Sequence, residues 1–279
     1  MELSQEVMQK CDVVVATGGP GLVHAAYTSG KPAYGVGAGN SQVIVDEVTD
    51  FAQFARETVF SRSYDHGTAC VCAQSIIYRK ELKDKIKDAL VKEKAHYIED
   101  EASIAKIRDI LFVDGHINGD MAGKNVQFIA KAAGVEVPDD ASILVLTPEK
   151  YGAEEALAGE KICPVLTAYQ CNDFDEALAI ALANYDVIGK GHTGGIYTTD
   201  NKKAIKAGIT LPVSRLMVNQ ATTDGGGALH NNLSPSNSLG CGSWGNNSIS
   251  ENLTYMHLLN VQRVTYRIAN PVSLDNVWD

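Results

Sequence analysis

Two kinds of hydrophobic pattern alternate along the chain. Short, mostly β-branched runs such as CDVVVA at 11–16 are typical of buried strands in a parallel sheet. Between them, apolar residues recur at helical spacing, as at Phe51, Phe54, Ala55 and Val59. This alternation predicts an α/β fold with a largely parallel sheet. Strands are expected at 11–16, 32–36, 42–45, 75–78, 142–146, 165–169, 195–199, 216–219 and 259–268, and helices at 22–29, 50–60, 81–94, 101–112, 126–133, 174–185 and 202–207.

Two segments depart from this alternation. Residues 225–245 are rich in Gly, Asn and Ser without periodicity, and a loop of this length inside a compact domain is usually functional. About ten residues precede Cys11, too few for another βα unit, although a buried parallel strand needs neighbours on both sides. We therefore expect part of the fold to lie upstream of this chain.

Composition narrows the function classes. The chain has 279 residues, 45% of them hydrophobic, which suits one large domain or two small ones. Its formal net charge of -10 argues against nucleic-acid binding, which depends on basic patches. No apolar run is long enough to span a membrane, and the polar start MELSQE is not a signal peptide. We expect a cytoplasmic protein without nucleic-acid or membrane partners.

The cysteines indicate reduced thiols rather than a disulfide framework or a metal site. Six cysteines are spaced irregularly, and Cys70 and Cys72 form C-x-C instead of the C-x-x-C of zinc sites. Cys70 follows a glycine-containing turn, YDHGTAC at 64–70, between a predicted helix and a predicted strand. Backbone N–H groups at such a turn lower a thiol pKa and make a nucleophile. The alternative is a small buried hydrophobe, as most free cysteines are.

Three glycine-rich segments are further candidates. His192, in GHTGG at 191–195, stands at the mouth of a predicted strand, where it acts as a base or is satisfied by backbone carbonyls. The turn TGGPG at 17–21 is placed like a phosphate cradle, but Pro20 removes one N–H donor, and a tight strand-to-helix turn is the alternative. The segment LGCGSWGNN at 239–247 is either a ligand-facing loop or a structured Ω-loop.

Taken in order, these motifs resemble the CoA-acylating aldehyde dehydrogenases. This family includes the CoA-dependent succinate-semialdehyde dehydrogenases and the aldehyde module of the bifunctional aldehyde–alcohol dehydrogenases. The matching segments are VVVATGGPG at 13–21, SGKPAYGVGAGN at 29–40, YDHG to Cys70 and Gln74-Ser75, GHT at 191–193, LGCGSWG at 239–245 and NSISENL at 247–253.

The resemblance implies an α/β, aldehyde-dehydrogenase-like three-layer fold with a truncated cofactor domain. Residues 1–38 correspond to a remnant of the NAD-binding domain, 39–250 to the catalytic domain and 251–279 to a C-terminal oligomerisation strand or arm. The family's N-terminal segment, with most of the NAD-binding domain and an oxyanion-donating asparagine, has no counterpart here. The implied assembly is a homodimer or a larger homo-oligomer, located in the cytoplasm or inside a bacterial microcompartment.

The resemblance also implies roles for individual residues. Cys70 corresponds to the nucleophile that forms a thioester, and His192 to the histidine that assists coenzyme A. Glu160, in EKICPV, corresponds to the glutamate that binds the nicotinamide-side ribose. The cofactor-binding set implied in this way is Thr17, Gly18, Gly19, Gly35, Gly37, Glu160 and Pro164, with NAD and coenzyme A as cofactors and a small aldehyde or semialdehyde as substrate.

Some positions separate this chain from its relatives. Hydrolytic relatives carry a glutamate base where this chain has Gly35, and its absence slows attack by water roughly 10²–10⁴-fold and so favours CoA. His66 and Ala73 stand where many relatives have Asn and Glu. Arg215 is either a partner for a substrate carboxylate or a structural arginine. The alternatives to an acylating enzyme are a catalytically incompetent fragment or assembly module, and a hydrolytic aldehyde dehydrogenase.

Overall fold

The computed structural model describes residues 2–269 and contains one large parallel sheet. Seven strands lie in the order β11-β10-β3-β4-β9-β8-β5, and every neighbouring pair is parallel, as the sequence predicted. The strands are β3 (Ser41–Val45), β4 (Ala73–Arg79), β5 (Ala95–Ile98), β8 (Ile143–Leu146), β9 (Val165–Cys171), β10 (Gly191–Tyr197) and β11 (Val213–Val218).

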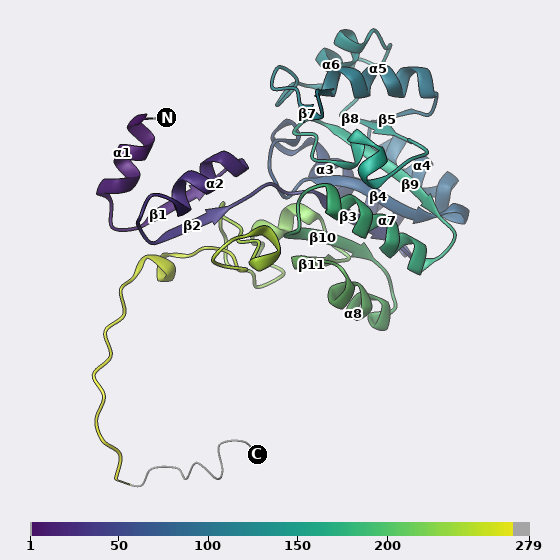
Figure 1. Cartoon of the computed structure of the whole chain (residues 1–279). Helices are drawn as coiled ribbons and strands as arrows, with labels where there is room; N and C mark the ends of the chain where they lie inside the picture. The colour runs from purple at the N-terminus through teal and green to yellow at the C-terminus, as the bar shows by residue number, and fades with distance from the viewer. Residues whose placement is uncertain (1, 270–279) are drawn as a thin grey trace.

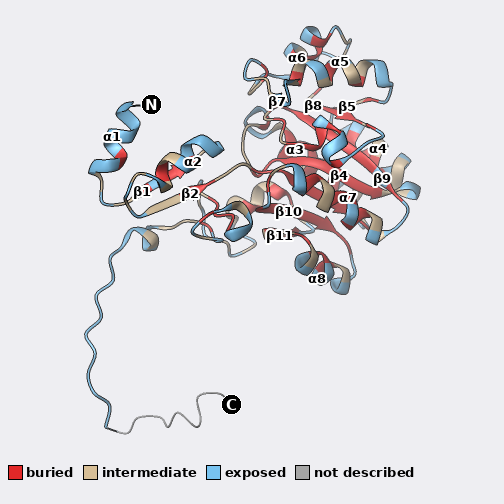
Figure 2. Cartoon of the chain, in the orientation of Figure 1, coloured by how far each residue is buried: buried red, intermediate tan, exposed pale blue. Residues whose placement is uncertain are grey.

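Helices cover both faces of this sheet, which makes three layers (Figure 1). On one face, α3 (Phe51–Ser63) and α4 (Lys83–Lys92) pack against the alternate side chains Val43, Ile76 and Val145. The opposite face carries α5 (Glu101–Leu111), α6 (Val126–Ala133), α7 (Phe174–Val187) and α8 (Asn201–Thr210). Figure 2 shows the strands as the buried centre of the molecule. The predicted three-layer α/β class is confirmed.

Aspartate and asparagine caps fix where most of these helices begin. The side chain of Asp50 accepts hydrogen bonds from the N–H groups of Ala52 and Gln53 at the start of α3. The same arrangement satisfies the free N–H groups at the starts of α5, α6, α7 and α8, where the capping residues are Asp100, Asn125, Asp173 and Asp200.

The first part of the chain forms a separate small unit (Figure 1). Its strands β1 (Val14–Thr17) and β2 (Ala33–Val36) pair in parallel, and α1 (Glu2–Lys10) and α2 (Pro20–Tyr27) pack on them. Residues 37–40 connect this unit to β3. The unit coincides with the segment 1–38 that the resemblance assigns to the cofactor domain, and that assignment stays a prediction.

The structure differs from the predicted elements at several places. Helix α1 and strand β5 were missed, and β10 begins at Gly191, four residues before the predicted start at 195. Residues 259–268 form no strand, because no strand among residues 2–269 pairs with them, and they lie exposed. The rest of the predicted arm, 270–279, lies outside the described residues. A short hairpin, β6 (Phe112–Val113) and β7 (His116–Ile117), completes the fold.

Candidate active site

Cys70 lies on a tight turn at the amino ends of the central strands. The turn follows α3 and leads directly into β4 at Ala73. Three successive residues, Asp65, His66 and Gly67, have left-handed backbone angles with φ of 48°, 52° and 73°. Asp, Asn and His are the non-glycine residues that tolerate this region best, so Asp65 and His66 suit these two positions. This turn points the chain back toward the sheet and places Cys70 before β4.

Six of the predicted site residues line one cavity of about 680 Å³. The cavity lies between the small N-terminal unit and the Cys70 turn, and the loop from 223 to 239 forms its remaining wall. It is therefore built from segments far apart in the sequence. The predicted residues that meet there are Thr17, Gly18, Gly19, Gly37, Cys70 and Glu160.

The pKa of Cys70 is shifted in the direction opposite to the prediction. Burial, followed by the negative charge of Glu160, raises the pKa of the Cys70 thiol to about 12. Backbone hydrogen bonding does lower it, as expected for a turn, but this is the weakest of the contributions. At neutral pH the side chain is a thiol, so attack by its sulfur requires a group that accepts the proton.

Glu160 is held beside Cys70 by Gly39. The N–H of Gly39 donates to Oε1 of Glu160 at 3.3 Å. Gly39 also lies directly against the backbone of Cys70, since a Cβ at this position would be 1.9 Å from the Cys70 carbonyl oxygen. Burial raises the pKa of Glu160 to about 7, while the Gly39 hydrogen bond and the charges of Arg62 and Lys161 oppose this shift.

Gly35 and Pro164 lie outside this cavity. The hydroxyl of Tyr27 donates to the Gly35 carbonyl at 3.1 Å and accepts from its N–H at 3.0 Å. A Cβ at Gly35 would lie 2.8 Å from Val23 and 2.9 Å from Tyr27. A glutamate therefore does not fit here unless α2 moves, and the expectation that the absence of a base at Gly35 favours CoA over water stays a prediction. The Pro164 carbonyl accepts from Leu144 beside β9.

The sequence suggested that His192 lies in an open loop at the mouth of a strand, but the residue lies within the strand. It belongs to β10 and retains 1% of its exposed surface. Its Nδ1 is 3.0 Å from the Thr193 hydroxyl. Burial, and then the charge of Arg215, lowers the pKa of His192 to about 3, so its imidazole is neutral at physiological pH. The flanking glycines misled the sequence prediction, because they allow close packing of the chain around Cys241 rather than an open loop.

Arg215 is a structural arginine in this fold. Its side chain is buried beside His192 and the segment from 240 to 252. All five of its N–H groups have acceptors, so a substrate carboxylate would have to displace one of them. The acceptors are Thr193 Oγ1, the Ser250 carbonyl, Asn252 Oδ1, and the carbonyls of His192 and Gly240.

Arg62 is a residue that the sequence pattern did not reveal. It is fully buried on α3 and bridges the two ends of the Cys70 turn. Its Nη1 donates to the Ala73 carbonyl at 2.9 Å and its Nη2 to the Gly67 carbonyl at 2.5 Å. An arginine at a helical position reads as a surface residue, so no sequence signal distinguished it from a solvated charge.

We expect Arg62→Lys to loosen this turn. Lysine keeps the charge but lacks the planar fork that reaches both carbonyls, so the folded state should lose about 1–3 kcal/mol. Urea unfolding measures this loss. The control is Arg79→Lys at the other end of β4, where Arg79 pairs with Glu81 near the surface and a change within about 0.5 kcal/mol is expected. Equal effects of the two substitutions would contradict the bridging role.

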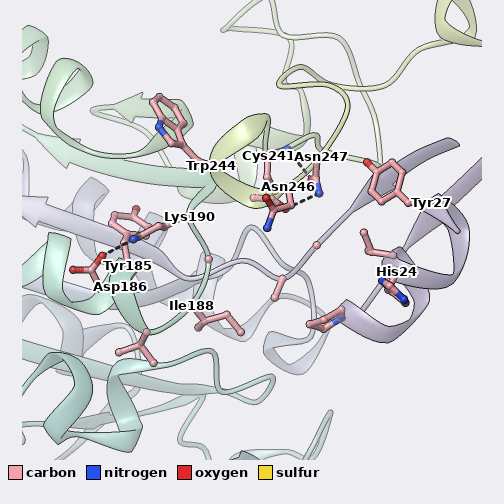
Figure 3. A pocket seen from close by; sticks show the side chains of 17 residues that line it. His24, Tyr27, Tyr185, Asp186, Ile188, Lys190, Cys241, Trp244, Asn246 and Asn247 are labelled. Carbon is pink, nitrogen blue, oxygen red and sulfur yellow. Dashed lines mark hydrogen bonds and ion pairs between the residues drawn. The ribbon is translucent and has the colours of Figure 1, made fainter.

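A second cavity, of about 490 Å³, lies on the other side of residues 37–38. Gly37 and Ala38 line both cavities and so form the wall between them. Figure 3 shows His24 and Tyr27 of α2 on one side of it and Trp244, with Lys190 and Asp186, on the other. Cys241 also lines this second cavity.

Among residues 2–269, no three His, Cys, Asp or Glu side chains lie close enough together to hold a metal ion. None of the helices in the same range is both long and apolar enough to cross a membrane.

Comparison with known proteins connects this site to one group of enzymes. No family model matches the chain. It is 48% identical to the acetylating succinate-semialdehyde dehydrogenase of Clostridium kluyveri over 99% of this chain and 62% of the relative. It is 35% identical to the bifunctional aldehyde-alcohol dehydrogenase of Escherichia coli over 97% of this chain and 31% of that protein.

A solved structure agrees with these relatives. The acetylating aldehyde dehydrogenase of Geobacillus thermoglucosidasius superposes with a TM-score of 0.92 at 38% identity, covering 98% of this chain and 61% of that one. The match runs through both the small N-terminal unit and the seven-stranded sheet. By sequence and by fold, the chain is a homologue of the CoA-acylating aldehyde dehydrogenases that spans about three fifths of the length of the acetylating relatives it matches.

Proposed function

We propose that this chain carries the catalytic part of an NAD-dependent, CoA-acylating aldehyde dehydrogenase, which interconverts an aldehyde and an acyl-CoA. The observation that supports this most directly is the cavity that joins Cys70, Glu160 and the turn at Thr17, Gly18 and Gly19. The names of the relatives support the reaction class.

In this proposal, Cys70 is the covalent nucleophile. Its sulfur attacks the aldehyde carbonyl to give a thiohemiacetal, and loss of hydride converts this to a thioester on Cys70. The nicotinamide cofactor supplies the hydride acceptor. The thiol of coenzyme A then attacks the thioester, the acyl group passes to CoA, and Cys70 is released. The turn of Cys70 holds the sulfur in the cavity during both transfers.

The cavity residues fit a nicotinamide cofactor. Cβ positions at Gly19 and Gly37 meet no atom within 4 Å, so the backbone there is open to a ligand. Helix α2 begins at Pro20 without a side-chain cap, which leaves its positive end for a phosphate. The Glu160 carboxylate is the group proposed to bind the ribose hydroxyls. An engineered glycolyl-CoA reductase at 25% identity contains NADP⁺, so the test includes both cofactors.

His192 is proposed to assist coenzyme A as a neutral imidazole. Access to it requires the segment from 239 to 247 to move, because Cys241 packs against Gly191 beside it. The proposed substrate is a short aldehyde or a semialdehyde, the class named for the succinate-semialdehyde and sulfoacetaldehyde relatives. The proposed location is the cytoplasm or a microcompartment within it, where the six free cysteines stay reduced.

The reaction class is tested with a panel of short aldehydes and semialdehydes, each supplied with NAD or NADP, with and without CoA. The proposal predicts that formation of the reduced cofactor depends on CoA and that acyl-CoA is the product. Formation of the free acid at the same rate without CoA would identify a hydrolytic enzyme instead.

We also propose that residues 259–268 add a strand to a second copy of the chain. They lie extended and exposed with apolar side chains, including Val264 at 81% and Tyr266 at 86% exposed. An unpaired extended segment of this kind gains its missing hydrogen bonds from a partner's sheet edge. We expect deletion of 259–279 to convert an oligomer to a monomer in light scattering after gel filtration. An unchanged molar mass per particle would contradict this assignment.

A further inference from the structure

Glu160 and Cys70 face the same cavity, and one backbone segment holds them together. Glu160 comes from the stretch before β9 and Cys70 from the turn before β4, and these two strands are neighbours in the sheet. Gly39 contacts both residues, since its N–H donates to the Glu160 carboxylate while its α-carbon lies against the Cys70 carbonyl. Gly39 therefore holds the Glu160 carboxylate close to the backbone of Cys70.

Few other groups in this cavity are able to accept a proton. Besides Cys70 and Glu160, its lining contains two ionisable side chains, Tyr64 and Asp224. Oδ2 of Asp224 is 3.1 Å from Nε2 of His230, so that carboxylate is already engaged. His192, the other candidate base, is buried in β10 and does not line the cavity.

We propose that Glu160 is the proton acceptor for the thiols that react in this cavity, first that of Cys70 and then that of coenzyme A. This inference rests on the proposed function and adds to the ribose contact a role that the resemblance does not assign. The general base is then a residue that lines the cavity, which Gly35 and His192 do not. His192, proposed above to assist coenzyme A as a neutral imidazole, is not the proton acceptor.

The two steps need only the aldehyde, the nicotinamide cofactor and coenzyme A, with water as the final proton acceptor. In the first, the Cys70 S–H proton passes to Glu160, the sulfur–carbon bond forms, and the carbonyl electron pair moves to oxygen, which takes the proton back. A bound nicotinamide cofactor would accept the hydride, and the hydroxyl proton would pass to water. In the second, the CoA thiol gives its proton to Glu160 and bonds to the acyl carbon. The bond from Cys70 to that carbon breaks, and the departing sulfur takes the proton from Glu160.

The charges around the pair suit this exchange. Burial places the pKa of Glu160 at about 7, close to the pH at which a general base works best. Arg62 on α3 and Lys161 in the adjoining segment oppose that rise. Burial, and then the negative charges of Glu160, Cys241 and Cys72, raise the pKa of Cys70. Cys70 in turn opposes the lowering of the Arg215 pKa by burial, so Arg215 on β11 is close enough to interact with it. With few thiolates present at neutral pH, the proton acceptor determines the rate.

The test is alkylation of Cys70 by iodoacetamide, without cofactor or substrate, across the range from about pH 5.5 to 9.5. Peptide mass spectrometry confines the readout to Cys70. We expect the wild-type rate to rise through a pKa of about 7 and then level, following deprotonation of Glu160. In Glu160→Gln, Cys70 should be alkylated roughly 10²-fold more slowly at pH 8. Its alkylation rate should rise about tenfold per pH unit, as expected when only the free thiolate reacts. Asp224→Asn, which removes the other carboxylate of the cavity, should behave as wild type.

An alkylation rate that does not fall in Glu160→Gln would overturn the proposal. If the Glu160 carboxylate only repels the thiolate, its removal lowers the pKa of Cys70, and Glu160→Gln reacts as fast as wild type or faster. Should that variant fail to fold, the wild-type profile still decides, because a rate that climbs steadily to pH 9.5 without levelling near 7 contradicts the proposal. Loss of the ribose contact does not affect an assay that contains no cofactor.

The failure of this inference is distinguishable from failure of the proposed function. Transfer of an acyl group from acyl-CoA to Cys70 in the wild-type protein supports the function on its own. If that transfer occurs while Glu160→Gln alkylates at the wild-type rate, the function stands and the role of Glu160 is wrong. If alkylation depends on Glu160 but no acyl transfer occurs, the proton acceptor is supported and the CoA-acylating function is wrong.

Discussion

Cys70→Ala should lower the rate of acyl transfer between the enzyme and coenzyme A roughly 10⁴–10⁶-fold, the loss seen when a covalent nucleophile is deleted. No other thiol lines the cavity that holds Glu160 and the glycine turn. The exchange between an acyl-CoA and the protein measures this directly, because the reaction needs no nicotinamide cofactor. The exchange rate is measured as the rate at which label passes from acyl-CoA to free coenzyme A.

Cys171→Ala is the matched control. Cys171 is a buried free cysteine at the carboxyl end of β9, whereas Cys70 is partly buried and lies at the amino ends of the strands. The substitution removes one sulfur from the core and leaves the cavity intact, so the exchange rate should stay near that of wild type. Persistent exchange in Cys70→Ala, or equal loss in both variants, would contradict the assignment of the nucleophile.

Gly39→Ala should have the second large effect. The added Cβ would lie 1.9 Å from the carbonyl oxygen and 2.8 Å from the carbonyl carbon of Cys70. Both contacts are with backbone, which cannot rotate away as a flexible side chain does, so the turn must shift. We expect the folded state to lose about 3 kcal/mol or more, and acyl exchange to fall roughly 10²-fold, because a displacement of about 1 Å at a reacting atom has that effect.

Gly119→Ala isolates this effect from the general cost of replacing glycine. Gly119 is exposed, and a Cβ there meets no atom within 4 Å. Urea unfolding and acyl exchange should both stay close to wild type in this control. A Gly39→Ala protein with wild-type stability and exchange would show that the contact between residue 39 and the Cys70 turn does not constrain the site.

The fold class was accessible from the sequence because burial on both faces leaves a strong signal. An interior strand such as β8, with the sequence ILVL, is a continuous apolar run, and the helices that cover the sheet carry one apolar face. Helix α1 and strand β5 were missed for a physical reason. Helix α1 buries one residue, Met8, and β5, with the sequence AHYI, leaves His96 and Tyr97 partly exposed at the sheet edge. Elements at the margin of a core carry too few apolar positions to produce a pattern.

The members of the candidate site could be named from the sequence, but not their electrostatics. The motifs pointed to Cys70, Glu160 and the glycine turn, which the fold brings into one cavity. The direction of the Cys70 pKa shift depends on its burial and on the distance to Glu160, 90 positions along the chain, and neither is encoded locally. For the same reason, the sequence could not show that His192 is covered or that Arg62 bridges the Cys70 turn.

The central claim is that Cys70 exchanges acyl groups with coenzyme A, and intact-protein mass spectrometry after incubation with acetyl-CoA tests it most directly. We predict that the wild-type chain gains the mass of one acetyl group, that peptide mapping places it on Cys70, and that added coenzyme A removes it. An acetyl group absent from the wild-type protein, or carried equally by Cys70→Ala, would contradict the proposed function.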